Sequence, residues 1–362
     1  MDVITCNEPS VGLRAIIAID DTTLGPALGG VRWKAYPSAA AAATEAQRLA
    51  AGMTLKNAAA ELPYGGGKSV ILDDGRAVDR VAVMHAFGAF VAQLDGRYIP
   101  GVDMGTTIQD LAQVGTIAPD VACSTEDPSP WTALGTWAAI RSAVQHASGA
   151  PTLSGVSVAV QGAGHVGASL ARLLAQDGAD VIVADVDSAR ARDIADEVGG
   201  RAVGAAAILT EPCDVLAPCA VARVVTTRNV HTLRCRILAG AANDLLGDGG
   251  CAAALAQRDI LYVPDFLANA GGVIHIHALR AGWSEAELRD AVLRIGERVT
   301  SALSNAERSG TSPLAAAEAL AAQQIERARH GGLHGDRAPV SGARKAGPRT
   351  VTGNARLAAL TR

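Results

Sequence analysis

Residues 156–167 read VSVAVQGAGHVG, and this stretch decides the fold of the second half of the 362-residue chain. Its valine-rich beginning predicts a short buried strand, and its glycines form the pattern G-x-G-x-x-G at Gly162, Gly164 and Gly167. In that pattern the first glycine permits a tight turn, the second lets a diphosphate approach the backbone, and the third lets the following helix pack closely on the strand. The stretch therefore predicts a dinucleotide site.

An acidic residue at the end of the next strand indicates which dinucleotide is bound. Asp185 lies 23 residues after the first glycine, where its carboxylate can accept hydrogen bonds from the adenosine ribose and repel a 2′-phosphate. His165 and Val166 open the intervening helix, whose N–H groups would face the phosphates. These residues favour NAD as the cofactor, while Arg190 and Arg192 leave NADP open.

The rest of the chain alternates between short apolar runs and helix-length stretches. In the second half, further strands are expected at residues 180–185, 213–216, 236–239 and 260–263, before a mostly helical region at 269–324. In the first half, strands are expected at residues 11–20, 69–72 and 98–102, and helices at 38–53, 78–94 and 131–148. Strands that alternate with helices imply an α/β fold with a parallel sheet covered on both faces.

The composition is that of a globular protein and excludes several classes. Hydrophobic residues make up 49% of the chain and charged residues 19%, which is the reverse of the balance in a disordered protein. The net charge of −4 argues against a nucleic-acid binder, and the absence of a long apolar run or a signal peptide predicts no membrane association and a cytoplasmic protein. The six cysteines lack CxxC spacing, which favours reduced thiols over disulfides, and we predict no metal site.

Lysine is scarce in this chain, and two of its lysines lie close together in the sequence. Only four of the 32 basic residues are lysines, and Lys56 and Lys68 are twelve residues apart. The run GGGKS at residues 65–69 is not a Walker phosphate loop, because that motif requires a glycine where Leu62 stands. We expect instead that one charged amine holds a substrate carboxylate, while the other is desolvated, has a lowered pKa and acts as a base.

A carboxylate near this site follows the strand predicted at residues 98–102. Asp103 could shuttle a proton between the substrate and solvent. It could also cap a helix that begins near Thr107, and the two roles are compatible.

Eight blocks of the sequence together resemble the amino-acid dehydrogenases that act on glutamate, leucine, phenylalanine and valine. They occur in the order found in that family, the resemblance covers about residues 11–325, and the chain length favours the leucine/valine/phenylalanine branch. The blocks are residues 24–32 (LGPALGGVR), 52–58 (GMTLKNA), 65–68 (GGGK), 103–107 (DMGTT), 127–133 (DPSPWTA), 217–220 (APCA), 240–243 (GAAN) and 269–274 (NAGGVI).

The resemblance implies a reaction and a role for each residue of the first half. An L-amino acid, NAD and water would give a 2-oxo acid, ammonia and NADH. Lys56 would bind the substrate carboxylate with help from the backbone of Gly29 and Gly30. Lys68 would activate the water that attacks the imino acid, and Asp103 would handle the proton of the amino group.

Four residues of the second half would complete the site according to the resemblance. Asn269 would hydrogen-bond the substrate or the cofactor at the mouth of the cleft. Ala242 and Asn243 would lie beside the nicotinamide, and Thr136 would approach it from the helix that connects the domains.

The resemblance also implies the domain organisation, with an α/β substrate-binding and catalytic domain at residues 1–134. A Rossmann-type doubly wound dinucleotide-binding domain would span residues 135–310, with a cleft between the two. Residues 311–332 would form a C-terminal helix that packs back on the first domain, and residues 333–362 a flexible basic tail. A nucleic-acid-binding arm at the tail would need aromatic residues, which it lacks, and the protein is expected to be a homo-oligomer.

The sequence departs from the family where the substrate pocket is expected. Residues 100–102 read PGV, where relatives carry threonine, alanine and then glutamate or cysteine, while His275 and His277 are interpreted as helix residues rather than metal ligands. Gly296, Val299 and Thr300 are candidates for the pocket wall. We expect an apolar amino acid as substrate. Two alternatives are an unusual 2-oxo acid aminated in specialised biosynthesis and a non-catalytic NAD-binding homologue.

Overall fold

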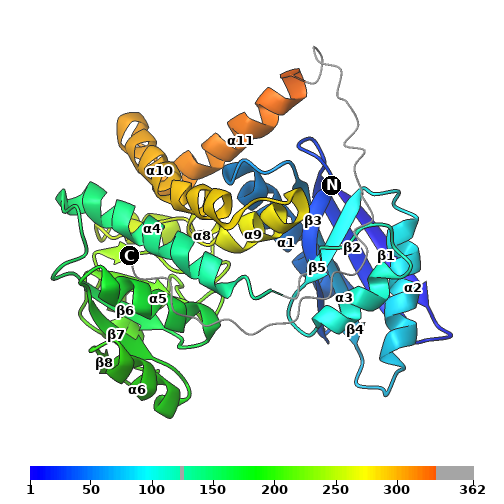
Figure 1. The fold of residues 1–362 in the computed structure, drawn as a ribbon, viewed down its shortest axis with the longest axis horizontal. Helices are drawn as coiled ribbons and strands as arrows, with labels where there is room; N and C mark the ends of the chain where they lie inside the picture. The colour runs from blue at the N-terminus through cyan, green and yellow to red at the C-terminus, as the bar shows by residue number, and fades with distance from the viewer. Residues whose placement is uncertain (123–125, 332–362) are drawn as a thin grey trace.

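A computed structural model describes residues 1–122 and 126–331, which form two α/β lobes with helices between and beside them (Figure 1). Cys123 and the predicted basic tail lie outside the described residues. The first lobe contains a five-stranded sheet in the order β1-β2-β4-β3-β5. Its strands are β1 (Asp2–Glu8), β2 (Leu13–Asp21), β3 (Ala27–Ala35), β4 (Gly65–Asp73) and β5 (Tyr98–Val102). β2 is antiparallel to both of its neighbours, whereas β3, β4 and β5 are parallel.

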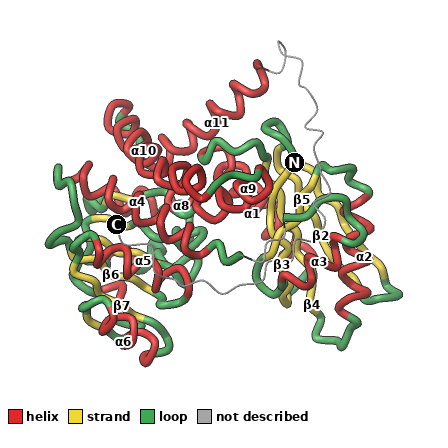
Figure 2. Tube along the Cα trace, viewed as in Figure 1, coloured by secondary structure: helices red, strands yellow, loops and turns green. Residues whose placement is uncertain are grey.

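Helices cover both faces of this sheet (Figure 2). α1 (Ala39–Ala59) lies on one face, where its alanines 42, 46 and 50 pack on Ile16 and Ala18 of β2. α2 (Arg80–Ala92) and α3 (Ile108–Gly115) cover the other face, in a cluster with Leu13 and Ile17. Because successive strand residues point to opposite faces, β2 is buried on both sides, which explains the continuous apolar run that predicted it.

The glycine run before Lys68 lies within β4, so the strand predicted at residues 69–72 began four residues too late and ended one residue too early. A Cβ at Gly65 would lie 1.8 Å from the Asp21 carbonyl oxygen, and one at Gly66 would lie 2.2 Å from the backbone nitrogen of Thr54. Only glycine therefore lets β4 pack this closely against β2 and α1. Two strands of this sheet, β1 and β3, were not predicted, because β1 is a polar edge strand and β3 contains adjacent glycines, and the two-residue strand at Arg201–Ala202 of the second lobe was not predicted either.

The second lobe contains a six-stranded sheet that is parallel throughout, in the order β11-β10-β9-β6-β7-β8. Its strands are β6 (Ser157–Gln161), β7 (Asp180–Ala184), β8 (Arg201–Ala202), β9 (Val215–Pro218), β10 (Ile237–Leu238) and β11 (Leu261–Tyr262). The chain moves outward in one direction through β6, β7 and β8, and in the other through β9, β10 and β11. This reversal beside β6 is the doubly wound arrangement, and it confirms the predicted fold class.

The remaining helices cover the second sheet or lie between the lobes. They are α4 (Ser129–Ser148), α5 (His165–Gln176), α6 (Ser188–Glu197), α7 (Cys251–Ala256), α8 (Asp265–Ala268), α9 (Gly271–Ala281), α10 (Glu285–Ser309) and α11 (Pro313–Gly331), with short 3₁₀ turns at Ile208–Thr210 and Val230–Thr232. α10 packs on α4, and α11 packs on both α10 and α1 (Figure 1). The largest apolar cluster includes Leu28, Tyr64 and Ile99 of the first lobe together with much of the core of the second, so it extends across both lobes, while the two faces of the first sheet have clusters of their own. None of the helices described is both long and apolar enough to span a bilayer.

Candidate active site

A cavity of about 360 Å³ lies between the lobes and collects most of the predicted substrate residues. The first lobe contributes Gly29, Gly30, Lys56, Lys68 and Asp103. The second lobe contributes Asn243, Asp244, Asp265, Phe266, Val273 and Ile276, and α11 adds Leu314 and Glu318. Charged groups and apolar side chains therefore share one cleft.

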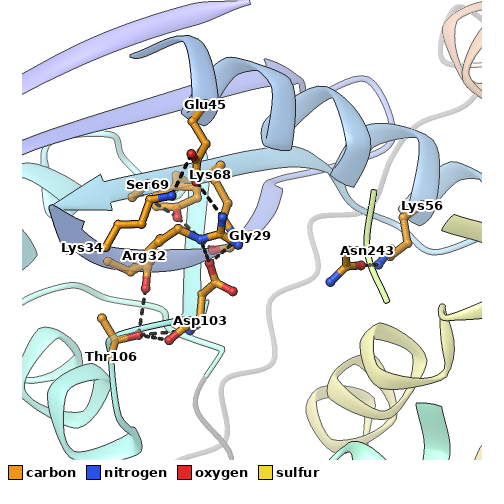
Figure 3. A network of polar contacts seen from close by, with 12 residues as sticks. Gly29, Arg32, Lys34, Glu45, Lys56, Lys68, Ser69, Asp103, Thr106 and Asn243 are labelled. Carbon is orange, nitrogen blue, oxygen red and sulfur yellow. Dashed lines mark hydrogen bonds and ion pairs between the residues drawn. The ribbon is translucent and has the colours of Figure 1, made fainter. Parts of the chain in front are cut away.

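Lys68 and Asp103 form a buried ion pair inside this cleft (Figure 3). Lys68 is 6% exposed, and its Nζ lies 2.8 Å from Asp103 Oδ2, to which Arg32 Nε also donates at 2.8 Å. Burial lowers the pKa of Lys68, although the charge of Asp103 opposes the shift. Burial works against ionisation of Asp103, but Lys68 and Arg32 outweigh it and hold the pKa of Asp103 well below its usual range. The pair thus combines an ionised carboxylate with a lysine that releases its proton more readily than usual.

The backbone around Asp103 is held by Thr106. The Thr106 hydroxyl accepts a hydrogen bond from the Asp103 backbone N–H at 3.0 Å and donates to the Val31 carbonyl oxygen at 2.8 Å. The alternative role of Asp103 as a helix cap is wrong, because Thr107 caps α3 in a reciprocal capping box with Asp110. The Asp103 carboxylate is therefore available to the cleft.

Lys56 reaches from α1 across the cleft to the second lobe. Its Nζ donates to Asn243 Oδ1 at 2.7 Å (Figure 3). Asn269 Nδ2 donates to the same oxygen at 2.9 Å. Burial lowers the pKa of Lys56 to about 8, and the charge of Lys68 adds to this shift while Asp265 opposes it. The structure thus brings together Lys56, Asn243 and Asn269, which are far apart in the sequence.

Three functional candidates were missed by the sequence reasoning. Asp265 is a buried carboxylate at the start of α8 whose pKa is raised by burial, and it lines the cleft. Arg32 and Glu45 form an ion pair at 2.6 Å beside Asp103. Arg32 stands within the resemblance block at residues 24–32, which is the only signal that pointed to it.

The glycine loop after β6 fits a dinucleotide diphosphate. Gly162 has a φ of +97°, and a Cβ on Gly167 would lie 1.8 Å from the Gly162 carbonyl oxygen, so both positions require glycine for the fold. A Cβ on Gly164 would meet no atom within 4 Å, so open space lies over this glycine at the start of α5. Backbone N–H groups and room for a phosphate therefore coincide at this loop.

The other predicted cofactor residues surround this loop. Asp185 follows β7, and its carboxylate accepts hydrogen bonds from the backbone N–H groups of Ala163 at 2.7 Å and Asp187 at 2.8 Å. The side chain of His165 is 82% exposed, and its Nδ1 lies 3.0 Å from Asp127 Oδ2. Val166 is partly buried behind them.

Thr136 and Ala242, which the resemblance places near the nicotinamide, are both buried. Thr136 is fully buried, and its hydroxyl donates to the carbonyl oxygens of Thr132 and Ala268 at 2.8 and 3.3 Å. Because this hydroxyl is used inside the protein, Thr136 supports α8 and does not face the cleft. Ala242 is 8% exposed, and its N–H donates to Pro218, beside the cleft residue Asn243.

The predicted pocket wall on α10 is wrong. Gly296 and Thr300 line a separate surface cavity with Trp137, and Val299 is buried in the core. In place of α10, the helices α9 and α11 contribute Val273, Ile276 and Leu314 to the wall of the cleft.

His275 and His277 lie on α9, as interpreted from the sequence. His275 Nε2 lies 3.2 Å from Glu126 Oε2, and His277 Nδ1 lies 3.0 Å from the Tyr64 hydroxyl. Within residues 1–122 and 126–331, the structure contains no group of three side chains suited to a metal ion.

Comparisons with known proteins identify the family. The model of the Glu/Leu/Phe/Val dehydrogenase dimerisation domain matches residues 2–116, and that of the Glutamate/Leucine/Phenylalanine/Valine dehydrogenase family matches residues 183–331. Leucine dehydrogenase of Bacillus subtilis is 38% identical over 90% of this chain and 92% of its own length. The chain belongs to the Glu/Leu/Phe/Val dehydrogenase family. It is accordingly an amino-acid dehydrogenase, an oxidoreductase that acts on CH–NH₂ groups, and its Rossmann-type lobe marks it as a user of a nucleotide cofactor.

Other relatives of this dehydrogenase differ in the amino acid for which they are named. Valine dehydrogenase of Streptomyces virginiae is 36% identical over 90% of this chain and 94% of its own length. The crystal structure of L-tryptophan dehydrogenase from Nostoc punctiforme superposes with a TM-score of 0.81 and 34% identity, covering 91% of this chain and 97% of that one. Family membership therefore does not specify which amino acid is the substrate, and the residues that line the cleft are the basis for inferring its side chain.

Proposed function

We propose that this dehydrogenase catalyses the NAD-dependent oxidative deamination of an apolar L-amino acid to its 2-oxo acid and ammonia, and the reverse reductive amination. The observation that carries the proposal is the placement of Lys68, Asp103 and Lys56 on one wall of a cleft whose other wall belongs to the dinucleotide-binding lobe. Proton-transfer groups and a cofactor site thus face one another.

The apolar part of the cleft supports an apolar substrate side chain. Leu49 and Met53 of α1, Val273 and Ile276 of α9 and Leu314 of α11 line it. A charged substrate side chain placed against these five apolar groups would lose its hydration there. We therefore place the side chain of the substrate against this wall.

The substrate carboxylate fits at Lys56, beside the glycine pair of β3. A Cβ on Gly30 would lie 2.7 Å from the Asp103 Cβ and 3.2 Å from Lys68 Nζ, so glycine at this position makes room for the ion pair. The Gly29 carbonyl oxygen accepts a hydrogen bond from the Tyr98 hydroxyl at 2.8 Å, which fixes the strand. A small amino acid backbone can then approach Lys56, Lys68 and Asp103 together.

Each side chain has a defined task in this reaction. Lys56 neutralises the substrate carboxylate, and ionised Asp103 accepts a proton from the substrate ammonium so that the amine can become an imine. NAD, when bound, takes the hydride that leaves Cα. Lys68 in its neutral form removes a proton from the water that attacks the imine carbon, and ammonia then leaves to give the 2-oxo acid. Closure of the lobes would exclude other water from these steps.

NAD is favoured over NADP by the groups at the end of β7. Asp185 has an 8% exposed side chain held against the glycine loop, where its negative charge would repel a 2′-phosphate. Arg190 Nη1 lies 3.5 Å from Asp185 Oδ1, so the positive charge that could attract such a phosphate is already paired. The exposed side chain of His165 at the start of α5 suits contact with the diphosphate, and the half-buried Val166 follows it in the first turn.

The organisation of the whole enzyme follows from the same proposal. We propose that residues 1–134 bind substrate, that residues 135–310 bind NAD, and that residues 311–332 close the substrate wall from the first lobe's side, with α11 on α1. We also propose a homo-oligomer formed through the first lobe, because the matching family model is that of a dimerisation domain. A cytoplasmic location suits an enzyme that draws on NAD, with Cys6, Cys213, Cys219, Cys235 and Cys251 all free.

The test is NADH oxidation, followed by absorbance, with ammonium and a panel of 2-oxo acids carrying branched, aromatic, indole and carboxylate side chains. We expect turnover with apolar members, poor turnover with the carboxylate member, and loss of turnover in Lys68→Ala. Arg97→Ala, which removes an exposed ion pair with Asp2 at the end of β5 opposite Asp103, is the control and should remain active. NADH binding by fluorescence separates a lost reaction from a lost cofactor. Turnover by Lys68→Ala, or none by the wild type on any member, contradicts the proposal.

A further inference from the structure

One oxygen of Asp103 receives two positive charges, while the other is left for the substrate. Lys68 Nζ and Arg32 Nε both lie 2.8 Å from Oδ2. Within the described part of the chain, no hydrogen bond is made to Oδ1 (Figure 3). The mechanism above uses Lys68 and Asp103, but it gives no task to Arg32.

Arg32 is itself anchored on its other side. Its Nη1 lies 2.6 Å from Glu45 Oε1, and Lys34 Nζ lies 3.0 Å from Glu45 Oε2. The side chains of Arg32 and Glu45 are only 17% and 20% exposed. Positive and negative charges therefore alternate along a chain of ion pairs that runs from Lys68 through Asp103, Arg32 and Glu45 to Lys34 (Figure 3).

A second arginine–aspartate pair in the same lobe shows what a structural pair looks like. Arg80 donates to both oxygens of Asp110, from Nε at 2.6 Å and from Nη2 at 2.7 Å, and Asp110 belongs to the capping box of α3. Arg32 instead gives Asp103 a single hydrogen bond and spends another N–H group on Glu45. Because Arg32 is held by both carboxylates, its positive charge is fixed beside Asp103 Oδ2, while Asp103 Oδ1 accepts no hydrogen bond from it.

We propose that Arg32 and Glu45 are positioning residues of the reaction: Arg32 acts on Asp103 and Lys68 as a fixed positive charge, and Glu45 holds Arg32 in place and limits that charge. The expected change in kcat rests on the proposed function, whereas the expected change in the titration of Lys68 rests on the ion-pair geometry alone.

The two residues act on Lys68 with opposite signs. The charge of Arg32 lowers the pKa of Lys68, and the charge of Glu45 raises it, in addition to the lowering by burial and the raising by Asp103. The other titratable groups around Asp103 are Lys56 on α1, Tyr98 on β5 and Tyr36 after β3. Removal of the Arg32 charge should therefore raise the pKa of Lys68, and removal of the Glu45 charge should lower it. A pair with a purely structural role would not shift this pKa in opposite directions.

The scarcity of lysine makes this effect directly measurable. The chain has only four lysines, so selective ¹³C labelling of the lysine side chains gives four NMR signals, and Lys68→Ala identifies the one from Lys68. In Arg32→Met we expect the titration midpoint of Lys68 to rise by about one pH unit, and in Glu45→Gln we expect it to fall. At a pH below the midpoint, the kcat of oxidative deamination should fall in Arg32→Met and rise in Glu45→Gln, because Lys68 acts as a base in its neutral form.

Two variants control the experiment. Arg32→Lys keeps a positive charge near Asp103, and it should restore the midpoint while recovering only part of kcat. Arg80→Met removes the structural pair and should leave the midpoint of Lys68 unchanged. NADH binding by each variant shows that it is folded.

The outcomes separate the two proposals. Midpoints that stay fixed, or that move the same way in Arg32→Met and Glu45→Gln, overturn the inference. The titration needs no turnover. If the two variants show opposed shifts of the Lys68 midpoint while the wild type turns over no substrate, the proposed function alone is contradicted.

Discussion

The two walls of the cleft are built in different ways. On the first lobe, the reacting side chains are already paired with one another, and Lys68 is only 6% exposed. On the second lobe, the glycine loop lies open, the His165 side chain is 82% exposed, and Val186, next to Asp185, is 94% exposed. Proton transfer requires groups that are fixed in advance, whereas a cofactor site requires groups that a ligand can still cover. Substitutions on the first-lobe wall should therefore change mainly kcat and the KM for the substrate, whereas substitutions on the second-lobe wall should change mainly the binding of the cofactor.

The largest effect is expected from the centre of the paired wall. In Asp103→Asn, the side chain keeps its size but loses the charge that receives the ammonium proton. We expect kcat to fall by about 10³-fold, within the range for a general base. The dissociation constant of NADH, measured by fluorescence, should stay at the wild-type value, because Asp103 belongs to the first lobe. A weakened NADH complex would show that the walls are not independent.

A smaller effect is expected where the two walls touch. Lys56→Met removes both the predicted carboxylate partner and the hydrogen bond to Asn243. We expect the KM for the 2-oxo acid to rise by about 10- to 100-fold, as for the loss of a charged hydrogen bond. Because the pKa of Lys56 is lowered to about 8, the wild-type kcat/KM should decline as pH rises through 8 and Lys56 loses its charge. A variant with unchanged KM would exclude Lys56 from carboxylate binding.

Two glycines of the open wall allow fold and function to be separated. Gly164→Ala adds a methyl group that meets no protein atom within 4 Å, so the melting temperature should not change. The same methyl group would crowd a diphosphate, and we expect NADH to bind about tenfold more weakly, or about 1.4 kcal/mol. Gly167→Ala should instead lower the melting temperature, because its Cβ would lie 1.8 Å from the Gly162 carbonyl oxygen. Equal NADH affinity in Gly164→Ala would remove the loop from the cofactor site.

The smallest effect is expected at the end of β7. Asp185→Asn removes the negative charge and one of the two ion pairs of Arg190, which keeps its contact with Asp187. The ratio of kcat/KM values for NADPH and NADH should rise severalfold, because the repulsion of a 2′-phosphate is gone. An unchanged ratio would mean that Asp185 only holds the loop through Ala163.

The sequence predicted the second lobe better than the first, for a physical reason. Strands buried on both faces are continuous apolar runs, as at residues 180–185, whereas β1 is a polar edge strand and β3 contains Gly29 and Gly30. Lys56, Lys68 and Asp103 were found because their chemistry is unusual for this chain. Their contacts were not predicted, because a contact such as Lys56–Asn243 depends on how the two lobes are placed relative to each other.

The supporting residues of the site were the hardest to predict. Arg32 and Glu45 are ordinary charged residues in an arginine-rich chain, and nothing in their spacing indicates that a strand and a helix bring them together. Asp265 precedes Asn269 by four residues, but only the structure shows that it is buried beside Lys56. Thr136 matched the family pattern by position, yet its burial gives its hydroxyl another use.

The packing of α11 on α1 has a consequence for anyone recombining this enzyme with a relative. By sequence, the last helix belongs to the half that carries the cofactor lobe, but Leu314 and Glu318 help to line the substrate cleft. α1 also holds Arg48, which pairs with Asp244 of the other lobe. A chimera joined at a single point near residue 134 would therefore mix two parents within one cleft. Grafting the substrate preference of one dehydrogenase onto another requires two crossover points, so that residues 1–134 and 311–331 come from the same parent.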